Sequence, residues 1–425
     1  MSAITSAHSS VDRGGLRVLL LSQFYPPDIG GIEVHVQALA RGLVARGHEV
    51  VVATLAMGEF GPGERLDEGV RVRRLQGALQ RIGPLFTTER RHAAPFPDPE
   101  LVSGLKRLAA EFKPDVVHAH NWIGRSYLPL KREVGAPYLL SLHDSGRICT
   151  QARMWYRNKE LCTGPSVGRC LPCCALQFGW PKGTVTYVAN RSVRGAEGRA
   201  VDLFLPVSTA VAESNHLAQD DLPFQVVPNF SVDALPSSAC TDARLAALPD
   251  RPFILQVGDV VADKGVQVLF EAYRMMDSPP PLVLIGRIDE QARATLPVGA
   301  TAIGTWPHDL VLEAWSRSLF GTMPSLCLDA CPTVTFEAMA AGKPVVASAR
   351  GGLLDQVVDG VTGLLVTPGD ATAMAQVMTL LVADRALRER LGEAARRRFD
   401  TEFRADIVID RLETIYLAQA GRKTP

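Results

Sequence analysis

The sequence predicts an α/β fold made of two doubly wound domains, each built on a parallel sheet. Near the start, the apolar run RVLLLSQF, the turn YPPDIGG, a helix-patterned segment and the run VVATLA follow one another, which is the order of a βαβ unit. The same rhythm restarts at FILQVGD, after a polar stretch near residues 231–250. At 425 residues the chain exceeds the usual size of one core, so two domains are expected.

The first domain is predicted from its first helix and the strands that follow. The segment IEVHVQALARGLVARGHEV repeats apolar residues at spacings of three and four until Gly47 ends the helix. Four runs rich in Val and Leu then suit strands buried on both faces: PDVVHAHN, PYLLSLHD, VDLFLPVS and FQVVPNF. Residues 59–99 break this rhythm with seven Arg against six acids. We interpret them as a variable segment near the glycine turn, and a solvated loop is an equally good alternative.

The second domain is predicted from six apolar runs with helical segments between them: FILQVGD, PLVLIGR, TAIGTW, LFGTMPS, KPVVAS and GLLVTP. Residues 372–420 are helical by pattern and contain no strand, so they either cap this domain or cross back to the first. We predict domains at 16–233 and 234–404, followed by a helix at 405–425 that crosses back. Doubly wound sheets bind ligands at the carboxyl ends of their strands.

Composition and charge exclude several classes of protein. Lys plus Arg equals Asp plus Glu at 45 each, whereas a nucleic-acid-binding domain is usually basic. No apolar run reaches the ~18 residues of a membrane span, which leaves at most a peripheral membrane contact. Residues 1–15 are Ser-rich and lack an apolar core, which predicts a disordered lead-in instead of a signal peptide. We therefore expect a cytoplasmic protein with reduced thiols.

The segment LDACPTVTFEAMAAGKPVV places two acids, Asp329 and Glu337, on either side of a predicted helix start. Pro332 suits the first turn of a helix because the missing backbone N–H would go unused there. The N–H groups of Thr333 and Val334 would then point out of the helix end, where an anion such as phosphate is favoured. The segment therefore predicts a phosphate-sized anion site between two carboxylates.

The spacing of these residues suggests how a ligand would bind. Glu337 follows Thr333 and Val334 on one helix face, so a ligand whose phosphate meets the helix start can offer a sugar hydroxyl to its carboxylate. Asp329 could accept hydrogen bonds from a second sugar. Lys264, in GDVVADKGVQVL after the first strand of this domain, could neutralise a diphosphate. The alternative is a helix with one Asp near its dipole, one solvated Glu and a surface Lys.

Several motifs in the same order resemble one known family. GDVVADKGVQVLFEA, DACPTVTFEAMAAGKPVVAS and GGLLDQVVDGVTGLLVTPGD resemble the C-terminal domain of the family 4 retaining glycosyltransferases, the glycosyl transferases group 1. FYPPDIGGIEVHVQALARGLVARGHEV resembles the N-terminal strand, glycine loop and helix of the same family. The resemblance covers nearly the whole chain. It implies the GT-B fold, in which two Rossmann-like domains face a cleft, and a nucleotide-sugar donor.

The resemblance also implies roles for individual residues. Asp329 and Glu337 match the two acids of the family's Glu-x7-Glu motif, of which the first binds the donor sugar and the second the ribose hydroxyls. Lys264 matches the family's diphosphate-binding Lys, and the glycine pair matches the loop that approaches the phosphates across the cleft. The donor-binding set that we predict is Gly30, Gly31, Lys264, Arg287, Asp329, Ala330, Cys331, Thr333, Val334 and Glu337.

Two departures from the family pattern concern charge and length. Asp259 stands where the family commonly has Arg, so one phosphate-neutralising charge is missing. Arg287, which follows VLIG, could supply another if its loop faces the cleft. Asp329 is one methylene shorter than the usual Glu but keeps the charge. Both departures leave the identity of the donor open.

Three histidines end strands of the first domain. His118 and His120 in VVHAH point to the same side of their strand and could bind a metal. Without a third ligand, a hydrogen-bonded strand end is the better interpretation. His143 in YLLSLHD resembles the family's Thr-x-His-Asp element with Ser141 in place of Thr, and in the family this His faces the reacting sugar. Asp144 could hold the ring of His143 in place.

Five cysteines crowd between residues 149 and 174, in a predicted insertion at 145–180. Cys149, Cys162, Cys170 and Cys173 contain a C-x2-C and two upstream thiols, a spacing compatible with a structural zinc site, and Cys174 is spare. A long insertion with few apolar residues would need such a crosslink. Unligated thiols are the alternative.

We therefore predict a retaining glycosyltransferase that moves a hexose-type unit from a UDP- or GDP-sugar to a hydroxyl of a glycan, a lipid-linked molecule or a natural product. The catalytic candidates are His143, Lys264, Asp329 and Glu337, and Lys264 with the helix start would stabilise the departing diphosphate. The resemblance implies no metal cofactor for the donor. The alternatives are a GT-B epimerase or hydrolase of the nucleotide sugar, and a non-catalytic nucleotide-sugar-binding subunit. Linkage and oligomeric state do not follow from the sequence.

Overall fold

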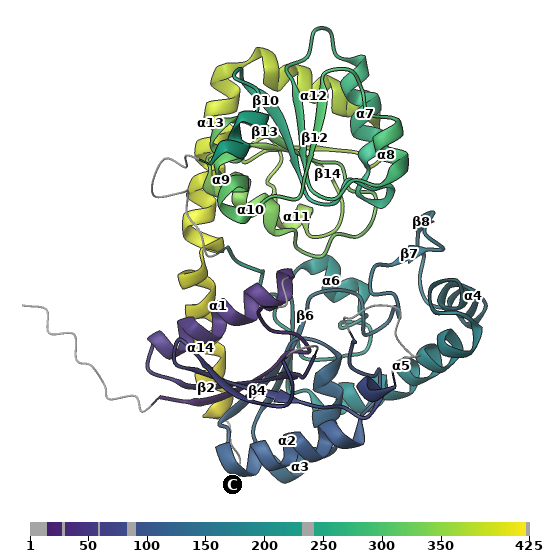
Figure 1. The fold of residues 1–425 in the computed structure, drawn as a ribbon, viewed down its shortest axis with the longest axis vertical. Helices are drawn as coiled ribbons and strands as arrows, with labels where there is room; N and C mark the ends of the chain where they lie inside the picture. The colour runs from purple at the N-terminus through teal and green to yellow at the C-terminus, as the bar shows by residue number, and fades with distance from the viewer. Residues whose placement is uncertain (1–14, 28–29, 58–59, 83–90, 232–241, 422–425) are drawn as a thin grey trace, which may run out of the picture.

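A computed structural model of the chain describes residues 15–27, 30–57, 60–82, 91–231 and 242–421. Two α/β domains lie one above the other, the first coloured purple to teal and the second green to yellow (Figure 1). Residues 1–14 of the predicted lead-in lie outside the described residues. Within the described ranges, no helix combines the length and the apolar character that crossing a bilayer requires.

The first domain is built on a seven-stranded sheet in the order β3-β4-β2-β1-β5-β6-β9. All neighbours pair in parallel except β3 with β4. Its six parallel strands follow the order 3-2-1-4-5-6 of a doubly wound fold, as predicted. The strands are β1 Arg17–Leu21, β2 Glu49–Leu55, β3 Gly63–Asp67, β4 Val70–Leu75, β5 Val116–Ala119, β6 Tyr138–Leu142 and β9 Leu203–Pro206.

Helices cover both faces of this sheet. Val18 and Leu20 of β1 pack into the apolar cluster that holds α1 and α14, whereas Leu19 and Leu21 pack into the cluster that holds α2. This alternation is the period of two expected of a strand buried on both faces. The helices of this domain are α1 Gly31–Ala45, α2 Pro99–Phe112, α3 Lys131–Val134, α4 Val167–Phe178, α5 Trp180–Ala200 and α6 Thr209–Ser214.

The second domain has a six-stranded parallel sheet in the order β12-β11-β10-β13-β14-β15, which is again 3-2-1-4-5-6. Its strands are β10 Phe253–Val257, β11 Leu282–Ile285, β12 Ala300–Gly304, β13 Ser318–Met323, β14 Val345–Ser348 and β15 Leu364–Val366. The apolar clusters place α7 and α12 on one face and α9 and α10 on the other. The helices are α7 Val266–Met275, α8 Glu290–Ala294, α9 His308–Arg317, α10 Thr333–Ala340, α11 Leu353–Gln356, α12 Ala371–Ala383 and α13 Arg385–Arg398.

The last helix, α14 (Ala405–Ala420), belongs spatially to the first domain. It runs down from the second domain and packs beside α1 (Figure 1). Ile409 and Leu412 enter the apolar cluster of α1 and β1. Tyr416 reaches further, because its hydroxyl lies 2.6 Å from His118 Nδ1 under the sheet. The chain therefore connects the two domains a second time at its end.

Two expectations about strands are wrong. FQVVPNF was expected to be a strand, but Phe224 makes only an isolated bridge to Phe204. Val227 N donates to Pro206 O at 3.0 Å, and Pro206 has no N–H to donate in return, so no regular ladder forms. For residues 59–99 the alternative of a solvated loop is wrong in the part that forms the hairpin of β3 and β4.

The arginines that suggested a loop alternate with buried valines in β4. Val70 and Val72 are buried, while Arg71 and Arg73 between and beside them form ion pairs with Glu111 on α2 at 3.0 and 3.1 Å. The Arg-rich pattern is therefore one face of a strand and not a loop.

Candidate functional site

Lys264 and Asp329 meet at the carboxyl ends of β10 and β13. Lys264 Nζ and Ser325 Oγ both donate hydrogen bonds to the Asp329 carboxylate. Gly265 has φ +74°, and a Cβ there would stand 1.8 Å from the Pro324 carbonyl oxygen, so only glycine lets the two loops approach this closely. Burial works to lower the pKa of Lys264, but the charge of Asp329 and its neighbours raises it above its ordinary value. Lys264 is therefore held as a cation.

The helix predicted after Asp329 is α10, which starts at Thr333 with Pro332 as its cap residue. Pro332 supplies no side-chain hydrogen bond, so no cap covers the N–H groups of the first turn. Ala330 and Cys331 form the loop between Asp329 and the helix. Gly352 N donates to Asp329 O at 2.7 Å and fixes this loop from the other side. The helix end and the acid–lysine pair therefore form one rigid unit.

Glu337 is 7% exposed and is held by two residues of α9. Trp315 Nε1 donates to Glu337 Oε2 at 3.1 Å, and His308 Nε2 lies 3.2 Å from Glu337 Oε1. The alternative of a solvated Glu is therefore wrong. Sequence reasoning missed Trp315 and His308, although a Trp on the apolar face of a helix is a signal, because a buried indole N–H needs an acceptor.

Asp259, which stands where the family commonly has Arg, forms an ion pair with Arg287. Arg287 Nη2 lies 2.6 Å from Asp259 Oδ2, and the Arg287 side chain is 76% exposed. Each charge cancels the other, so this pair offers no net positive charge to a phosphate. Arg287 therefore pairs with Asp259 and not, within the described residues, with Asp329 or Glu337.

In the first domain, His143 joins a chain of hydrogen bonds that reaches the second. His143 Nδ1 lies 3.2 Å from Asn229 Oδ1, and Asn229 Nδ2 donates to Cys331 O at 3.2 Å. On the other side, His143 Nε2 lies 3.1 Å from His120 Nδ1. The expectation that Asp144 orients the ring is wrong, because its carboxylate accepts from Gly146 N at 2.7 Å instead. Asn229 orients the ring of His143 instead, and nothing in the sequence indicated this.

Burial keeps the histidines of this region neutral. It lowers the pKa of His143 to about 4, although the bond to Asn229 acts in the opposite direction. It also lowers the pKa values of His35 and His120 well below the ordinary value, aided by neighbouring imidazoles. His118 lies between Tyr416 and Ser141, whose oxygens are 2.6 and 2.8 Å from its ring nitrogens. All four rings therefore act as neutral donors and acceptors near neutral pH.

Replacing His118 with Gln is expected to make the fold less sensitive to acid. Burial lowers the pKa of His118 to about 3, below its ordinary 6.5, so the unfolded chain binds the proton more readily. The free energy of unfolding therefore falls as pH drops below 6.5. Between pH 7.5 and 5.5, urea unfolding should show the native chain losing about 1.4 kcal/mol more than the variant. Equal losses of unfolding free energy in the two proteins would contradict a lowered pKa for His118.

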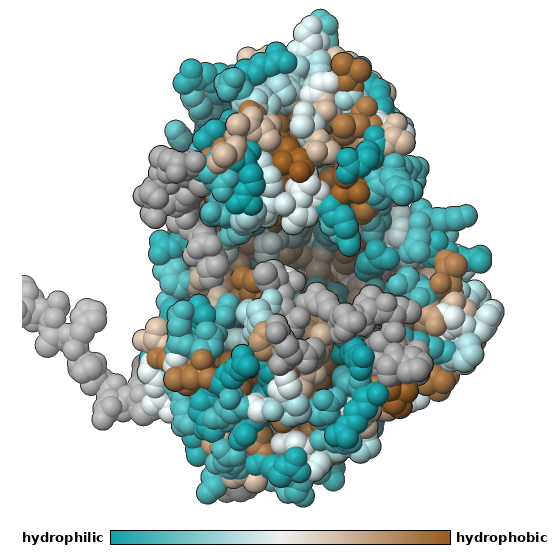
Figure 2. All heavy atoms as spheres, viewed as in Figure 1, coloured by the Kyte–Doolittle hydropathy of each residue, from teal (hydrophilic) through white to brown (hydrophobic). Residues whose placement is uncertain are grey.

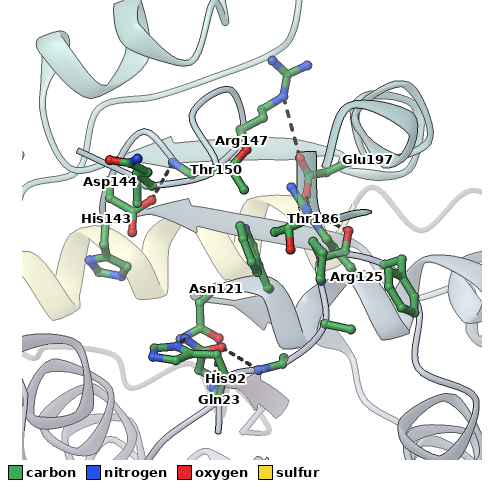
Figure 3. Close-up of a pocket in the computed structure, with 18 of the residues that line it drawn as sticks. Gln23, His92, Asn121, Arg125, His143, Asp144, Arg147, Thr150, Thr186 and Glu197 are labelled. Carbon is green, nitrogen blue, oxygen red and sulfur yellow. Dashed lines mark hydrogen bonds and ion pairs between the residues drawn. The ribbon is translucent and has the colours of Figure 1, made fainter. Parts of the chain in front are cut away.

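A cavity of about 880 Å³ opens beside His143 in the first domain. It lies at the carboxyl ends of β1, β5 and β6, next to the hollow that separates the two domains in Figure 2. Figure 3 shows Gln23, His92 and Asn121 on one side of it and His143 and Asp144 on another. The lining also includes the aromatic rings of Phe96, Trp122 and Phe178.

Buried ion pairs form the wall of this cavity. Arg125 Nε donates to Glu197 Oε1 at 3.1 Å, and Arg147 Nε lies 3.8 Å from Glu197 Oε2. These contacts tie α5 to the strand ends, since Glu197 lies on α5 and Arg147 follows β6. The cavity therefore combines aromatic faces with fixed polar groups, which is the ordinary make-up of a small-molecule site.

The glycine pair lies at the start of α1. Gly30 is the cap residue and Gly31 the first helical residue, and among the described residues no atom lies within 4 Å of a Cβ placed on Gly31. The backbone is therefore open to a ligand at this point. One turn later, His35 packs on Phe230 with ring centroids 4.3 Å apart and points towards His120 and His143.

The cysteines of the insertion converge without forming a ligand set. Cys149, Cys162, Cys170, Cys173 and Cys174 all line one small cavity between α4 and the hairpin of β7 (Trp155–Tyr156) and β8 (Glu160–Leu161). In the described part of the chain, no three of their sulfurs lie within 4.8 Å of one another. A zinc ion at these thiols stays a prediction. The same insertion reaches the donor half, because Arg153 pairs with Asp263 at 3.0 Å.

Two family models match the chain, one in each domain. Glycosyl transferase 4-like domain matches residues 30–214, and Glycosyl transferases group 1 matches residues 241–398. Both models describe proteins that transfer sugars. The second match contains the whole unit around Lys264, Asp329 and Glu337, and the first contains the glycine pair and His143.

Curated relatives match over nearly their whole length. Glycogen synthase of Mycobacterium tuberculosis is 27% identical over 96% of this chain and 97% of its own. D-inositol 3-phosphate glycosyltransferase of Xylanimonas cellulosilytica is 28% identical over 97% and 98%. A 2-deoxystreptamine N-acetyl-D-glucosaminyltransferase of Streptomyces fradiae is 26% identical over 95% and 97%.

Solved structures share the fold. Sucrose-phosphate synthase from Thermosynechococcus elongatus superposes with a TM-score of 0.71 at 23% identity, covering 95% of this chain and 98% of that one. HepE of Anabaena in complex with UDP-glucose superposes with a TM-score of 0.65 at 17% identity, covering 95% and 100%. At 23% and 17% identity, these two similarities show that the fold is shared.

Proposed function

The chain belongs to the family 4 glycosyltransferases of the GT-B fold, and on that premise we propose that it transfers a hexose-type unit from a nucleoside diphosphate sugar to an acceptor hydroxyl, with retention of configuration. The observation that carries the proposal is the bridge from His143 through Asn229 to Cys331 O. It brings a polar strand end of the first domain to the uncapped start of α10 in the second. A sugar bound between them would be in reach of both.

The donor would lie along the second domain. Its diphosphate would meet the start of α10 and Lys264, because cations and free helix N–H groups both favour a phosphate. Its ribose hydroxyls would donate to Glu337, which Trp315 holds in a fixed position. The sugar would face Asp329. When the donor binds, its groups would share the carboxylate of Asp329 with Lys264 and Ser325.

The chemical step is the breaking of the bond between the sugar and the diphosphate. Lys264 and the α10 start would stabilise the negative charge that develops on the departing oxygen, which is electrostatic stabilisation of the transition state. The same oxygen can take the proton of the attacking hydroxyl, so no separate general base is required. Neutral His143 would contact the reacting sugar and hold it against the cavity.

The relatives favour a UDP-sugar and a hydroxylated ring as acceptor. HepE, which shares the fold, binds UDP-glucose, and curated relatives act on inositol phosphate and 2-deoxystreptamine, both of which are hydroxylated rings. The cavity beside His143 has room for such a molecule, with Trp122 and Phe178 as faces for stacking and Gln23 and Asn121 as polar partners. A glycan end or a lipid-linked sugar presents the same chemistry.

A thermal-shift screen tests the donor. A ligand that binds only the folded chain raises its melting temperature, by an amount set by the ratio of its concentration to its Kd. UDP and UDP-hexoses should raise the melting temperature, and GDP or ADP with their sugars should do so less. If none of these nucleotides changes the melting temperature, a nucleotide-sugar donor is excluded.

Replacing Arg287 with Ala is expected to change kcat/KM by less than about threefold. Its guanidinium is exposed and neutralised by Asp259, and exposed pairs contribute about 0–1 kcal/mol. Steady-state kinetics with UDP-glucose and an acceptor would measure the effect. A loss above tenfold would show that Arg287 leaves Asp259 and binds the diphosphate.

A further inference from the structure

His35, His120 and His143 surround one point in the first domain, where one ring nitrogen of each lies within 4.8 Å of the other two. We propose that these three imidazoles bind one divalent transition-metal ion of the zinc class. Three imidazoles with an open fourth position are a common set for such ions. His120 and His143 also line the 880 Å³ cavity, so the fourth position can hold water.

The hydrogen-bond chain fixes where lone pairs point. The Cys331 carbonyl can only accept, so the amide nitrogen of Asn229 faces it and Asn229 Oδ1 faces His143. His143 Nδ1 must then carry the proton, which leaves a lone pair on Nε2, directed at His120. An outer hydrogen bond that sets the tautomer of a histidine is what metal-binding histidines usually have.

Two nitrogens of the cluster are left without partners. His35 Nδ1 and His120 Nε2 are buried and have no hydrogen-bond partner within the described ranges. Leaving a buried polar atom unpaired costs about 1–3 kcal/mol, so such atoms call for a missing partner. An ion at the centre of the cluster would give a ring nitrogen of His35 a partner, and His120 would bind the ion through Nδ1 and carry its proton on Nε2.

The spacing of the nearest pair suits an ion. His120 Nδ1 and His143 Nε2 are 3.1 Å apart. Two nitrogens that each lie about 2.05 Å from one tetrahedral ion are about 3.3 Å apart. The ion could therefore replace the proton that the two rings share with little movement. All three rings come from fixed positions, since His35 lies on α1, His120 follows β5 and His143 follows β6.

An ion at the three histidines would also affect sugar transfer, and this consequence rests on the proposed function. If His143 contacts the reacting sugar, one ring cannot serve the ion and the donor together. The ion would then inhibit transfer, and the donor would weaken ion binding by the same factor, because coupling between two ligands is reciprocal.

Ion binding can be measured on the chain alone, without donor or acceptor. After removal of metals with a chelator, Zn²⁺ binding is followed by competition with a chromogenic chelator. The native chain should bind one Zn²⁺ more per molecule than either His35→Phe or His120→Gln. Phe keeps the ring packing on Phe230 but has no lone pair. Thiols of the insertion would add equally to every protein, so the difference isolates the three-histidine site.

The matched control is His216→Gln, a histidine outside the cluster, which should bind as many ions as the native chain. If His35→Phe did not fold, as judged by circular dichroism, His120→Gln would decide alone. Equal Zn²⁺ stoichiometry in the native chain and the folded variants would overturn the proposal. If UDP-glucose did not displace the extra ion, the metal site would still be supported. The proposed contact of His143 with the reacting sugar would be contradicted.

Discussion

Lys264→Ala is expected to lower the kcat/KM of sugar transfer about 10²–10³-fold, the usual effect of removing one group that stabilises a developing negative charge. The predicted donor-binding set contains two cations, of which Lys264 contacts Asp329, whereas Arg287 is exposed and pairs with Asp259. The loss should appear in kcat as well as in KM, since the charge on the departing diphosphate grows during the reaction. Steady-state kinetics with UDP-glucose and an acceptor sugar would measure both.

The control for this variant is Lys106→Ala, which removes an exposed lysine of α2 that pairs with Glu133 at 2.9 Å. It should leave kcat/KM within about twofold, because exposed ion pairs contribute little. Removing Lys264 also leaves Asp329 with one partner fewer, so the melting temperature of each variant must be compared first. A folded Lys264→Ala chain that loses less than tenfold in kcat would contradict the role given to this residue.

Glu337→Gln is expected to weaken binding of UDP by about tenfold to a hundredfold. The variant keeps the shape of the side chain and an oxygen for Trp315 Nε1, but it removes the charge that ribose hydroxyls would meet. A hydrogen bond to a charged group contributes about 1.5–3 kcal/mol, and each 1.4 kcal/mol is a factor of ten. Isothermal titration with UDP would measure the Kd directly.

Glu313→Gln on α9 is the matched control, because Glu313 pairs with Arg317 at 2.7 Å on the side of the helix away from Glu337. Its Kd for UDP should equal that of the native chain. The effect of Glu337→Gln should fall on KM more than on kcat at saturating donor, in contrast to Lys264→Ala. If both Glu variants bound UDP equally well, the ribose contact would be wrong.

The sequence predicted the architecture because both domains repeat a simple pattern. Parallel strands buried on both faces read as short apolar runs, and eleven of the twelve sheet strands on the doubly wound pattern coincide with runs that were identified. The exception is β4, in which Val70 and Val72 are separated by arginines because only one face of this strand is fully buried. FQVVPNF is apolar but is not a strand, because Pro206 beside it has no N–H to donate and no regular ladder forms.

Local chemistry was also predictable at the functional site. The start of α10 follows from Pro332, and the closeness of Lys264 to Asp329 follows from both lying after central strands of one parallel sheet. These features depend on a few adjacent residues and on a topology that the pattern already specifies.

The partners that hold the site together could not be predicted, because they come from distant parts of the chain. Asn229 is 86 residues from His143 and 102 from Cys331, and it lies in a segment with no regular structure of its own. His35 occupies one position on the buried face of α1 and reads as part of an ordinary helix until β5 and β6 are placed beside it. Charge and hydrogen bonding between such residues are fixed by packing, which a single sequence does not show.

The anomer released from UDP-glucose shows whether transfer retains configuration, and measuring it needs no knowledge of the acceptor. In the absence of acceptor, a slow transfer of glucose to water is expected, and proton NMR at early times distinguishes α-glucose from β-glucose before the two interconvert. We expect α-glucose to appear first, at a rate that falls sharply in Lys264→Ala. Release of β-glucose first, or equal rates in the native chain and Lys264→Ala, would contradict a retaining transfer driven by the charge at Lys264.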